Sequence, residues 1–106
     1  RRCGTVYLGG EASDRGFCAS SFACDRLRCT DCNFEVLRFG SKAWDESTID
    51  YMFLRNNAPD PVKLGARLLD SPGSCAYACQ CSWQTAAELR VLSPTERPRW
   101  ACGGHI

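Results

Sequence analysis

Apolar residues occur along this chain in short runs, most of them bounded by glycine, proline or asparagine. Thr5–Leu8 and Asn33–Phe39 are rich in branched and aromatic residues and are followed by glycines, which predicts two strands. Ala76–Trp83 and Arg99–Cys102 predict two more strands. Residues 11–23 are small and polar, and predict a loop.

One helix is expected in the middle of the chain. Asp60 suits an N-cap, and Pro61 suits the first helical position. The apolar spacing then continues the helix to Leu69, before Pro72–Gly73 ends it.

A second helix signal lies near the C-terminus. Thr85 and Glu88 have the spacing of a capping box, which predicts a helix to about Leu92. The spacing of apolar residues in Asp45–Arg55 fits one face of a helix and the alternation of a strand equally well. The chain is therefore predicted to be one cysteine-rich α+β domain over residues 1–106, with antiparallel strands and two or three short helices.

Composition excludes several classes of protein. The 106 residues are 44% hydrophobic, which suffices for one modest core in which Trp44 and Trp83 are expected to pack. The net charge of +1 argues against a nucleic-acid partner. The longest apolar run, Cys75–Cys79, cannot span a bilayer. Because the chain has no phosphate loop, dinucleotide fingerprint or carboxylate-based catalytic motif, we expect neither an enzyme nor a small-molecule substrate.

Cysteine is the strongest compositional departure. The chain has nine cysteines, an odd number, and secreted disulfide scaffolds normally have an even number. This count favours a reducing, cytoplasmic location, where clustered cysteines are more often metal ligands than disulfides. Reduced core thiols and disulfides remain the alternatives.

Two close cysteine pairs predict a structural zinc site. Cys29 and Cys32 form a Cys-x-x-Cys motif, whose turn can aim both sulfurs at one centre. Cys79 and Cys81 form a Cys-x-Cys motif, in which a strand would place both side chains on one face. Four soft thiolates are the shell that structural Zn²⁺ prefers.

A second zinc ion has candidate ligands in the remaining cysteines and the single histidine. The plainer interpretations are that these cysteines are buried core thiols and that His105 lies in a frayed C-terminal tail. Cys75 is not needed as a ligand of either site. The candidates are Cys3, Cys24, Cys102 and His105, with Cys18 as a substitute.

Arginines near the cysteines suggest a surface for partners. Arg26 and Arg28 flank the first motif, and Arg97 and Arg99 precede Trp100. Arginine with tryptophan is enriched at protein interfaces, and basic clusters favour anionic membrane lipids. A merely solvated face is the plainer interpretation.

A thiol oxidoreductase using Cys29 and Cys32 is a weaker alternative. Such motifs sit at the N-terminus of a helix, whose dipole lowers the thiol pKa. Here the motif runs into the strand-like segment Asn33–Phe39, which disfavours redox catalysis.

Motifs spread over nearly the whole chain resemble one known family. Val6–Gly10, Ala23–Asp25, Leu27–Cys29 and Cys32 resemble the C-terminal domain of the retinal-maintenance family of cilia- and flagella-associated proteins. The resemblance is clearest at Ala76–Trp83. It includes Trp44–Asp45, Asp50–Tyr51, Phe53, Arg55–Asn57, Pro59, Arg99–Trp100, Cys102–Gly103 and His105.

The resemblance implies a non-enzymatic cytosolic protein of the cilium or flagellum, at its base or axoneme, or of the photoreceptor. Members are associated with retinal dystrophy and ciliopathy, outer-segment membrane organisation, anionic lipids and ciliary partner proteins. Fuller members carry an acidic N-terminal region that this chain lacks. The family pattern does not call for Cys75, and Leu68–Gly73 lacks the expected lysines, which weakens the case for a lipid-binding basic patch.

Overall fold

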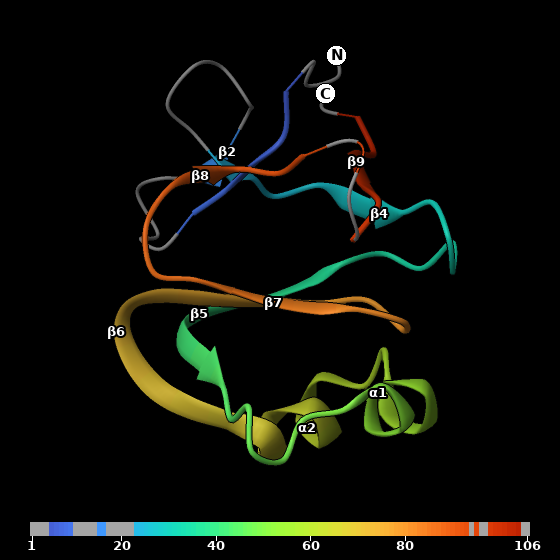
Figure 1. Cartoon of the computed structure of the whole chain (residues 1–106), viewed down its shortest axis with the longest axis vertical. Coiled ribbons are helices and arrows are strands. Elements are labelled where there is room, and N and C mark those ends of the chain that lie inside the picture. Colours follow the sequence, from blue (N-terminus) through green and yellow to red (C-terminus); the bar gives the residue numbers. More distant parts are fainter. Residues whose placement is uncertain (1–4, 10–14, 17–22, 94, 96–97, 105–106) are drawn as a thin grey trace.

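A three-stranded antiparallel sheet with strand order β5–β6–β7 separates two layers of the fold (Figure 1). Its strands are β5 (Leu37–Trp44), β6 (Leu68–Ala78) and β7 (Trp83–Ala86). The computed structural model describes residues 5–9, 15–16, 23–93, 95 and 98–104. Strand β6 is central, so both layers pack against the same strand.

Two short helices form the layer on one side of the sheet. Helix α1 (Tyr51–Asn57) begins at Asp50, whose carboxylate accepts the N–H of Phe53 at 2.7 Å. Helix α2 (Pro61–Leu64) begins at Asp60 and continues as the 3₁₀ turn η2 (Gly65–Arg67). The N-caps thus fix where both helices start. No helix among the described residues is long and apolar enough to cross a bilayer.

Short strand pairs form the layer on the other side of the sheet. Strands β1 and β8 pair antiparallel, as do β4 and β9, whereas β2 and β3 pair parallel. Their bounds are β1 Tyr7–Leu8, β2 Arg15–Gly16, β3 Ala23–Cys24, β4 Leu27–Cys29, β8 Arg90–Val91 and β9 Trp100–Cys102.

Strand β6 and the turn that follows it contribute side chains to two hydrophobic cores. Cys75, Tyr77 and Cys79 face the core beneath the strand pairs, and Ala76 and Ala78 face the core beneath the helices. Because successive side chains of a strand point to opposite faces, a strand buried on both faces is apolar throughout. This explains the one long apolar run of the sequence.

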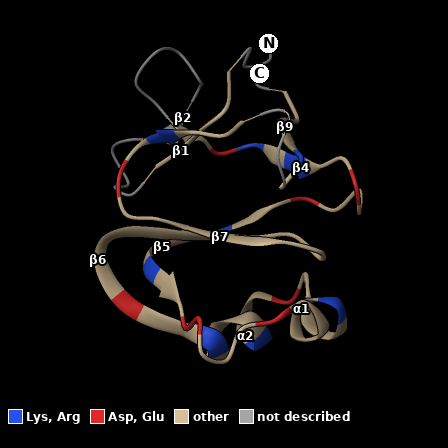
Figure 2. Cartoon of the chain, viewed as in Figure 1, with Lys and Arg blue, Asp and Glu red and all other residues tan. Residues whose placement is uncertain are grey.

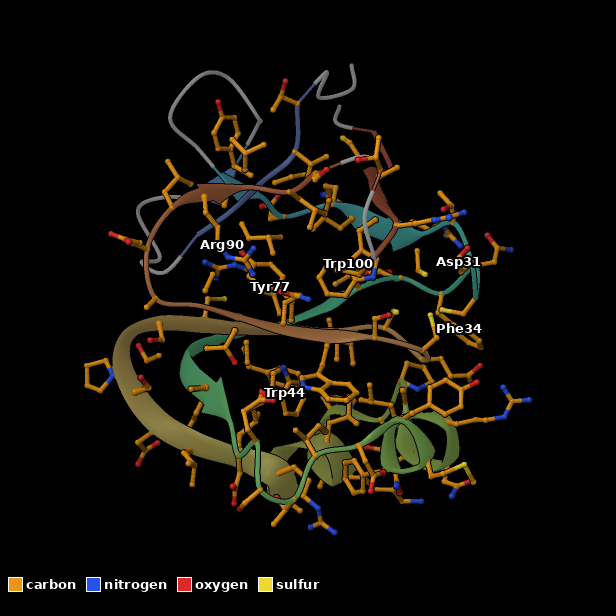
Figure 3. All side chains as sticks on the ribbon, viewed as in Figure 1. Asp31, Phe34, Trp44, Tyr77, Arg90 and Trp100 are labelled. Atoms are coloured by element: carbon orange, nitrogen blue, oxygen red, sulfur yellow. The ribbon has the colours of Figure 1, made fainter. Side chains whose placement is uncertain are left out.

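Aromatic side chains fill both cores. Trp44 lies between the sheet and the helices, and its indole N–H donates to the carbonyl of Tyr77 at 3.0 Å (Figure 3). Tyr77 and Trp100 lie in the opposite core with their ring centroids 6.2 Å apart. Trp83 packs against the core beneath the helices but is only half-buried, and its indole N–H donates to the carboxylate of Glu46.

The predicted helix from Asp60 to Leu69 is too long. Helical structure ends at Arg67, because Leu68 pairs with Trp44 as the first residue of β6. The predicted stop at Pro72–Gly73 lies inside the strongly curved β6 (Figure 1). A φ of 86° at Gly73, which suits glycine, allows this backbone path.

The predicted helix after Thr85 is wrong. Thr85 pairs with Ala76 inside β7, and its hydroxyl accepts the backbone N–H of Trp44 instead of capping a helix. Residues 90–91 then form strand β8. A contact with a residue 41 positions away thus overrides the local capping signal.

The predicted strands exist with shifted bounds. The strand expected over Asn33–Phe39 starts at Leu37 and runs past Gly40, where Ser41 (φ 59°) makes a bulge. The strand expected over Ala76–Trp83 is broken by a turn at 79–82. Of the loop predicted over residues 11–23, the structure describes only Arg15–Gly16 and Ala23. These residues belong to strands β2 and β3 instead of a loop.

Candidate metal centre

The first cysteine pair lies in a turn at the end of β4. Cys29 is the last residue of that strand, and its Sγ accepts the backbone N–H of Cys32 at 3.4 Å. The N–H of Asn33 closes the turn onto the carbonyl of Cys29, and Asn33 has a φ of 62°. Asparagine tolerates this left-handed conformation well, so the local sequence suits the turn.

The second pair lies in the hairpin between β6 and β7. The N–H of Cys79 donates to the carbonyl of Ser82 at 3.0 Å, which closes the turn. The sulfurs of Cys79 and Cys81 lie 3.6 Å apart. The expected convergence is present, but a turn rather than strand alternation produces it.

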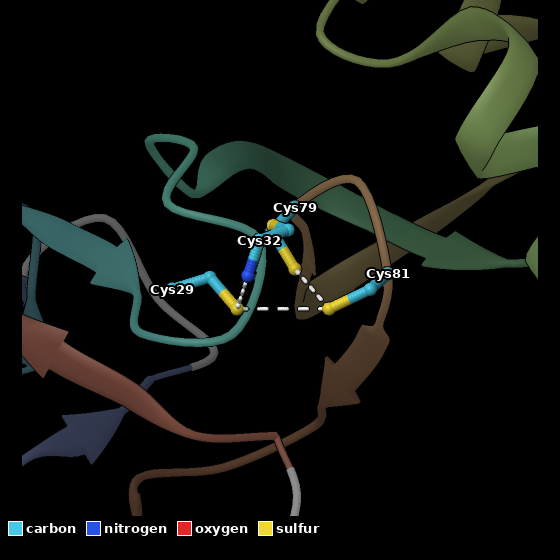
Figure 4. A group of neighbouring side chains, drawn as sticks. All are labelled: Cys29, Cys32, Cys79 and Cys81. Carbon is cyan, nitrogen blue, oxygen red and sulfur yellow. Dashed lines mark hydrogen bonds between the residues drawn. The ribbon is translucent and has the colours of Figure 1, made fainter.

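The two turns bring all four sulfurs together (Figure 4). The Sγ atoms of Cys29, Cys32, Cys79 and Cys81 lie within 4.8 Å of one another. Cys29 and Cys81, from different turns, have their sulfurs 3.6 Å apart. Four thiolates at about 2.3 Å from a tetrahedral zinc ion lie about 3.8 Å apart, so this cluster has suitable dimensions for the ion.

Burial and backbone amides act differently on these thiols. Burial raises the pKa of Cys79 and of Cys81. Burial also opposes ionisation of Cys32, but hydrogen bonds from the backbone N–H groups of Phe34 and Gln80, together with those of the Cys29 and Cys79 thiols, outweigh it and lower the pKa of Cys32 to about 7. Such N–H donors also stabilise a metal-bound thiolate.

Trp100 is a member of this site that the sequence did not reveal. Its indole N–H donates to the Sγ of Cys79 at 3.2 Å. The sequence grouped Trp100 with the arginines of a suggested partner surface, but Trp100 is only 5% exposed, because β9 pairs with β4 and turns this side chain into the core. The pairing of Trp100 with Cys29 in the β-ladder depends on long-range register, which local patterns do not indicate.

The second cysteine group is described only in part. Cys24 and Cys102 are both buried in the same core. Burial, together with the neighbouring Cys102 thiol, raises the pKa of Cys24 to about 12. Cys3, Cys18 and His105 lie outside the described residues, so the second site stays a prediction. Cys75 is buried and separate from the four-cysteine cluster.

The arginines in and next to the β4–β9 pair are exposed. Arg28 lies opposite Ala101 in the β4–β9 ladder, and Arg26 and Arg99 are likewise exposed. Arg28 also donates to the carbonyl of Asn33 at 2.8 Å. Arg97 lies outside the described residues. Basic residues also occur in β5 and in the helices (Figure 2).

Comparison with known proteins gives the site a family context. A family model described as Retinal Maintenance matches residues 1–105. This chain belongs to the Retinal Maintenance family. The resemblance inferred from the sequence motifs is therefore confirmed. No solved structure matches the chain.

Named relatives of this Retinal Maintenance chain come from several vertebrates. Cilia- and flagella-associated protein 418 of Rattus norvegicus and of Homo sapiens are each 45% identical to it over 99% of its length. The Danio rerio protein of the same name is 44% identical. The chain covers 50%, 51% and 52% of these three relatives, so it spans about half of their length. Their name refers to cilia and flagella and to no enzymatic activity.

Proposed function

We propose that this chain is a non-enzymatic protein-interaction domain of the cilium or flagellum, folded around a structural zinc ion. The observation that carries the proposal is the cluster formed by Cys29, Cys32, Cys79 and Cys81, whose sulfurs lie within 4.8 Å of one another. Family membership and the name of the relatives support the ciliary location.

The position of the cluster explains what a metal ion would do there. Cys29 ends β4, and Cys79 follows β6, so one ion joins the strand-pair layer to the central sheet. Trp100 connects strand β9 to the same site through its hydrogen bond to Cys79. Because the ligands come together only in the folded chain, the free energy of zinc binding stabilises the fold.

The proposed partners are ciliary proteins, bound by the surface that the metal-stabilised fold presents. The proposed location is cytoplasmic, at the ciliary base or axoneme, and in animals also in the photoreceptor. Such a domain supports organisation of the cilium or of outer-segment membranes. Removing zinc therefore abolishes partner binding through unfolding, with no turnover to lose.

Localisation in ciliated cells tests the proposal. The chain is expressed as a fluorescent fusion, with the Cys29→Ser/Cys81→Ser double variant and Cys75→Ala as a matched control. We expect ciliary signal for the parent and the control, and diffuse or degraded protein for the double variant. Ciliary localisation of all three would contradict a metal-dependent interaction domain, and absence of all three from cilia would contradict the ciliary role.

Binding to anionic membrane lipids is the second candidate. Arg26, Arg28 and Arg99 lie in or next to the β4–β9 pair and are all exposed, which supports a basic surface. Sedimentation with phosphatidylserine vesicles should then fall with added salt and in the Arg26→Glu/Arg28→Glu variant. Binding that is indifferent to both changes would contradict it.

Thiol oxidoreductase activity through Cys29 and Cys32 is the weakest candidate. The motif begins at the last residue of β4 and is followed in the chain by strand β5, so it does not open a helix as an activated Cys-x-x-Cys motif does. Turnover in an insulin-reduction assay would favour this candidate over the structural site.

A further inference from the structure

One side of the four-cysteine cluster opens onto a surface cavity. The cavity has a volume of about 360 Å³ and is lined by Asp31, Cys32, Tyr51, Arg55, Gln80 and Cys81. It lies between α1 and the two cysteine turns. Its volume exceeds the roughly 30 Å³ share of one water molecule, so small solutes can enter.

The four sulfurs are unequal in their access to this cavity. Cys29 is fully buried and Cys79 is 2% exposed. Cys32 and Cys81 are half-buried and line the cavity. A reagent that enters from solvent therefore meets Cys32 and Cys81 first.

The sulfur of Cys81 has two close sulfur neighbours. Its Sγ lies 3.6 Å from that of Cys29 and 3.6 Å from that of Cys79. Cys79 and Cys81 lie in the same turn and are separated only by Gln80, so a disulfide between them would close a very small ring. Cys29 comes from the other turn and can reach Cys81 without that constraint.

We propose that Cys81 is an oxidation site for hydrogen peroxide or another small hydroperoxide, and that its oxidation forms a Cys29–Cys81 disulfide that expels the bound metal. In the first step the Cys81 thiolate attacks the O–O bond, which gives Cys81–SOH and releases hydroxide or alkoxide. In the second step the Cys29 thiolate attacks that sulfur, forms the S–S bond and releases hydroxide. Two thiolates lose two electrons in total, and the peroxide gains them.

Expulsion of the ion follows from the ligand count. A disulfide removes two of the four thiolates, and Cys32 and Cys79 alone do not fill a tetrahedral zinc shell. The metal-release half of this inference rests on the proposed zinc site, whereas the disulfide half rests only on the sulfur geometry.

Peroxide titration of the zinc-loaded chain tests both halves. Zinc release is followed with a colorimetric indicator, and disulfides are mapped by mass spectrometry after alkylation of the remaining thiols. We expect release of the ion in step with a single Cys29–Cys81 disulfide, and recovery on adding dithiothreitol and zinc. Zinc retained under oxidation, or first oxidation at the buried Cys75, would overturn the inference.

Two neighbouring residues of α1 provide a matched pair of variants. Tyr51 lines the cavity, whereas Met52 is exposed on the same helical turn and does not. Tyr51→Ala should open the cavity and accelerate zinc release by peroxide several-fold, and Met52→Ala should leave the rate unchanged. Equal rates in both variants would overturn the proposed route of entry.

The outcome also separates this inference from the proposed function. A chain that binds zinc but resists peroxide contradicts the redox inference and leaves the structural zinc site standing. A chain that takes up no zinc contradicts the structural site and metal release, while disulfide mapping still tests the Cys29–Cys81 bond.

Discussion

The indole N–H of Trp100 donates a 3.2 Å hydrogen bond to the Sγ of Cys79, and this bond ties strand β9 to the cysteine cluster. The two residues are 21 positions apart and both are buried. A donor to a thiolate sulfur stabilises its negative charge and fixes its direction. The candidate metal centre therefore has a tryptophan hydrogen-bonded to one of its four cysteines.

Trp100→Phe should weaken zinc binding while keeping an aromatic ring in the core. We expect the zinc affinity to fall about 10- to 100-fold, since loss of a hydrogen-bond partner to a ligand typically has this effect. A competition titration against a chelator of known affinity measures it.

Trp44→Phe is the matched control. It removes an indole N–H bond to the Tyr77 carbonyl in the other core. We expect it to lower the free energy of unfolding by about 1 kcal/mol without changing zinc affinity. Parent-like zinc affinity in the Trp100 variant would contradict a role for Trp100 in the site.

Cys81→Ala and Cys75→Ala should differ sharply in zinc content and in stability. Cys81 belongs to the cluster, whereas Cys75 is buried outside it. Cys75→Ala should lower the free energy of unfolding by about 1 kcal/mol and keep the zinc. Cys81→Ala should lose the zinc and the cooperative unfolding transition. Equal tolerance of the two changes in thermal unfolding would rule out the four-thiolate assignment.

Zinc affinity should fall as the pH is lowered. Zinc binds deprotonated thiols, and burial raises the pKa of Cys79 and Cys81, so both carry protons in the metal-free protein at neutral pH. Each proton displaced lowers the affinity by about tenfold per pH unit of acidification. Competition titrations from about pH 8 to about pH 6, corrected for the chelator's own protonation, measure the slope. An affinity independent of pH would contradict thiolate ligation.

Asp50→Ala should destabilise the helical layer alone. Asp50 caps α1 through its bond to the Phe53 N–H, and loss of such a cap costs about 1 kcal/mol. Asp50→Asn should retain most of that stability, and both variants should keep their zinc. Chemical unfolding and zinc content check this, and loss of zinc in either variant would contradict the separation of the two layers.

Local patterns predicted the clustering of the four cysteines better than they predicted the helices. The spacings of Cys29/Cys32 and Cys79/Cys81 identified the four residues that cluster, because each pair is held by its own turn. The N-cap at Asp60 was likewise predicted, since the cap and its helix are adjacent in sequence.

Contacts between distant residues determine the features that local sequence patterns did not predict. Leu68 leaves the helix because it pairs with Trp44, and Thr85 bonds to the same tryptophan instead of capping a helix. Trp100 joins the cysteine cluster through the β4–β9 register. Each of these contacts connects residues more than 20 positions apart, beyond the reach of a local pattern.

Zinc K-edge X-ray absorption of the purified chain tests whether the four cysteines hold a zinc ion. We expect bound zinc with four sulfur ligands at about 2.3 Å, and loss of this signal in Cys81→Ala. If the second site is also filled, a nitrogen contribution from His105 would be added to it. Zinc bound only by nitrogen and oxygen, or a metal-free chain with reduced thiols and an unchanged fold, would contradict it.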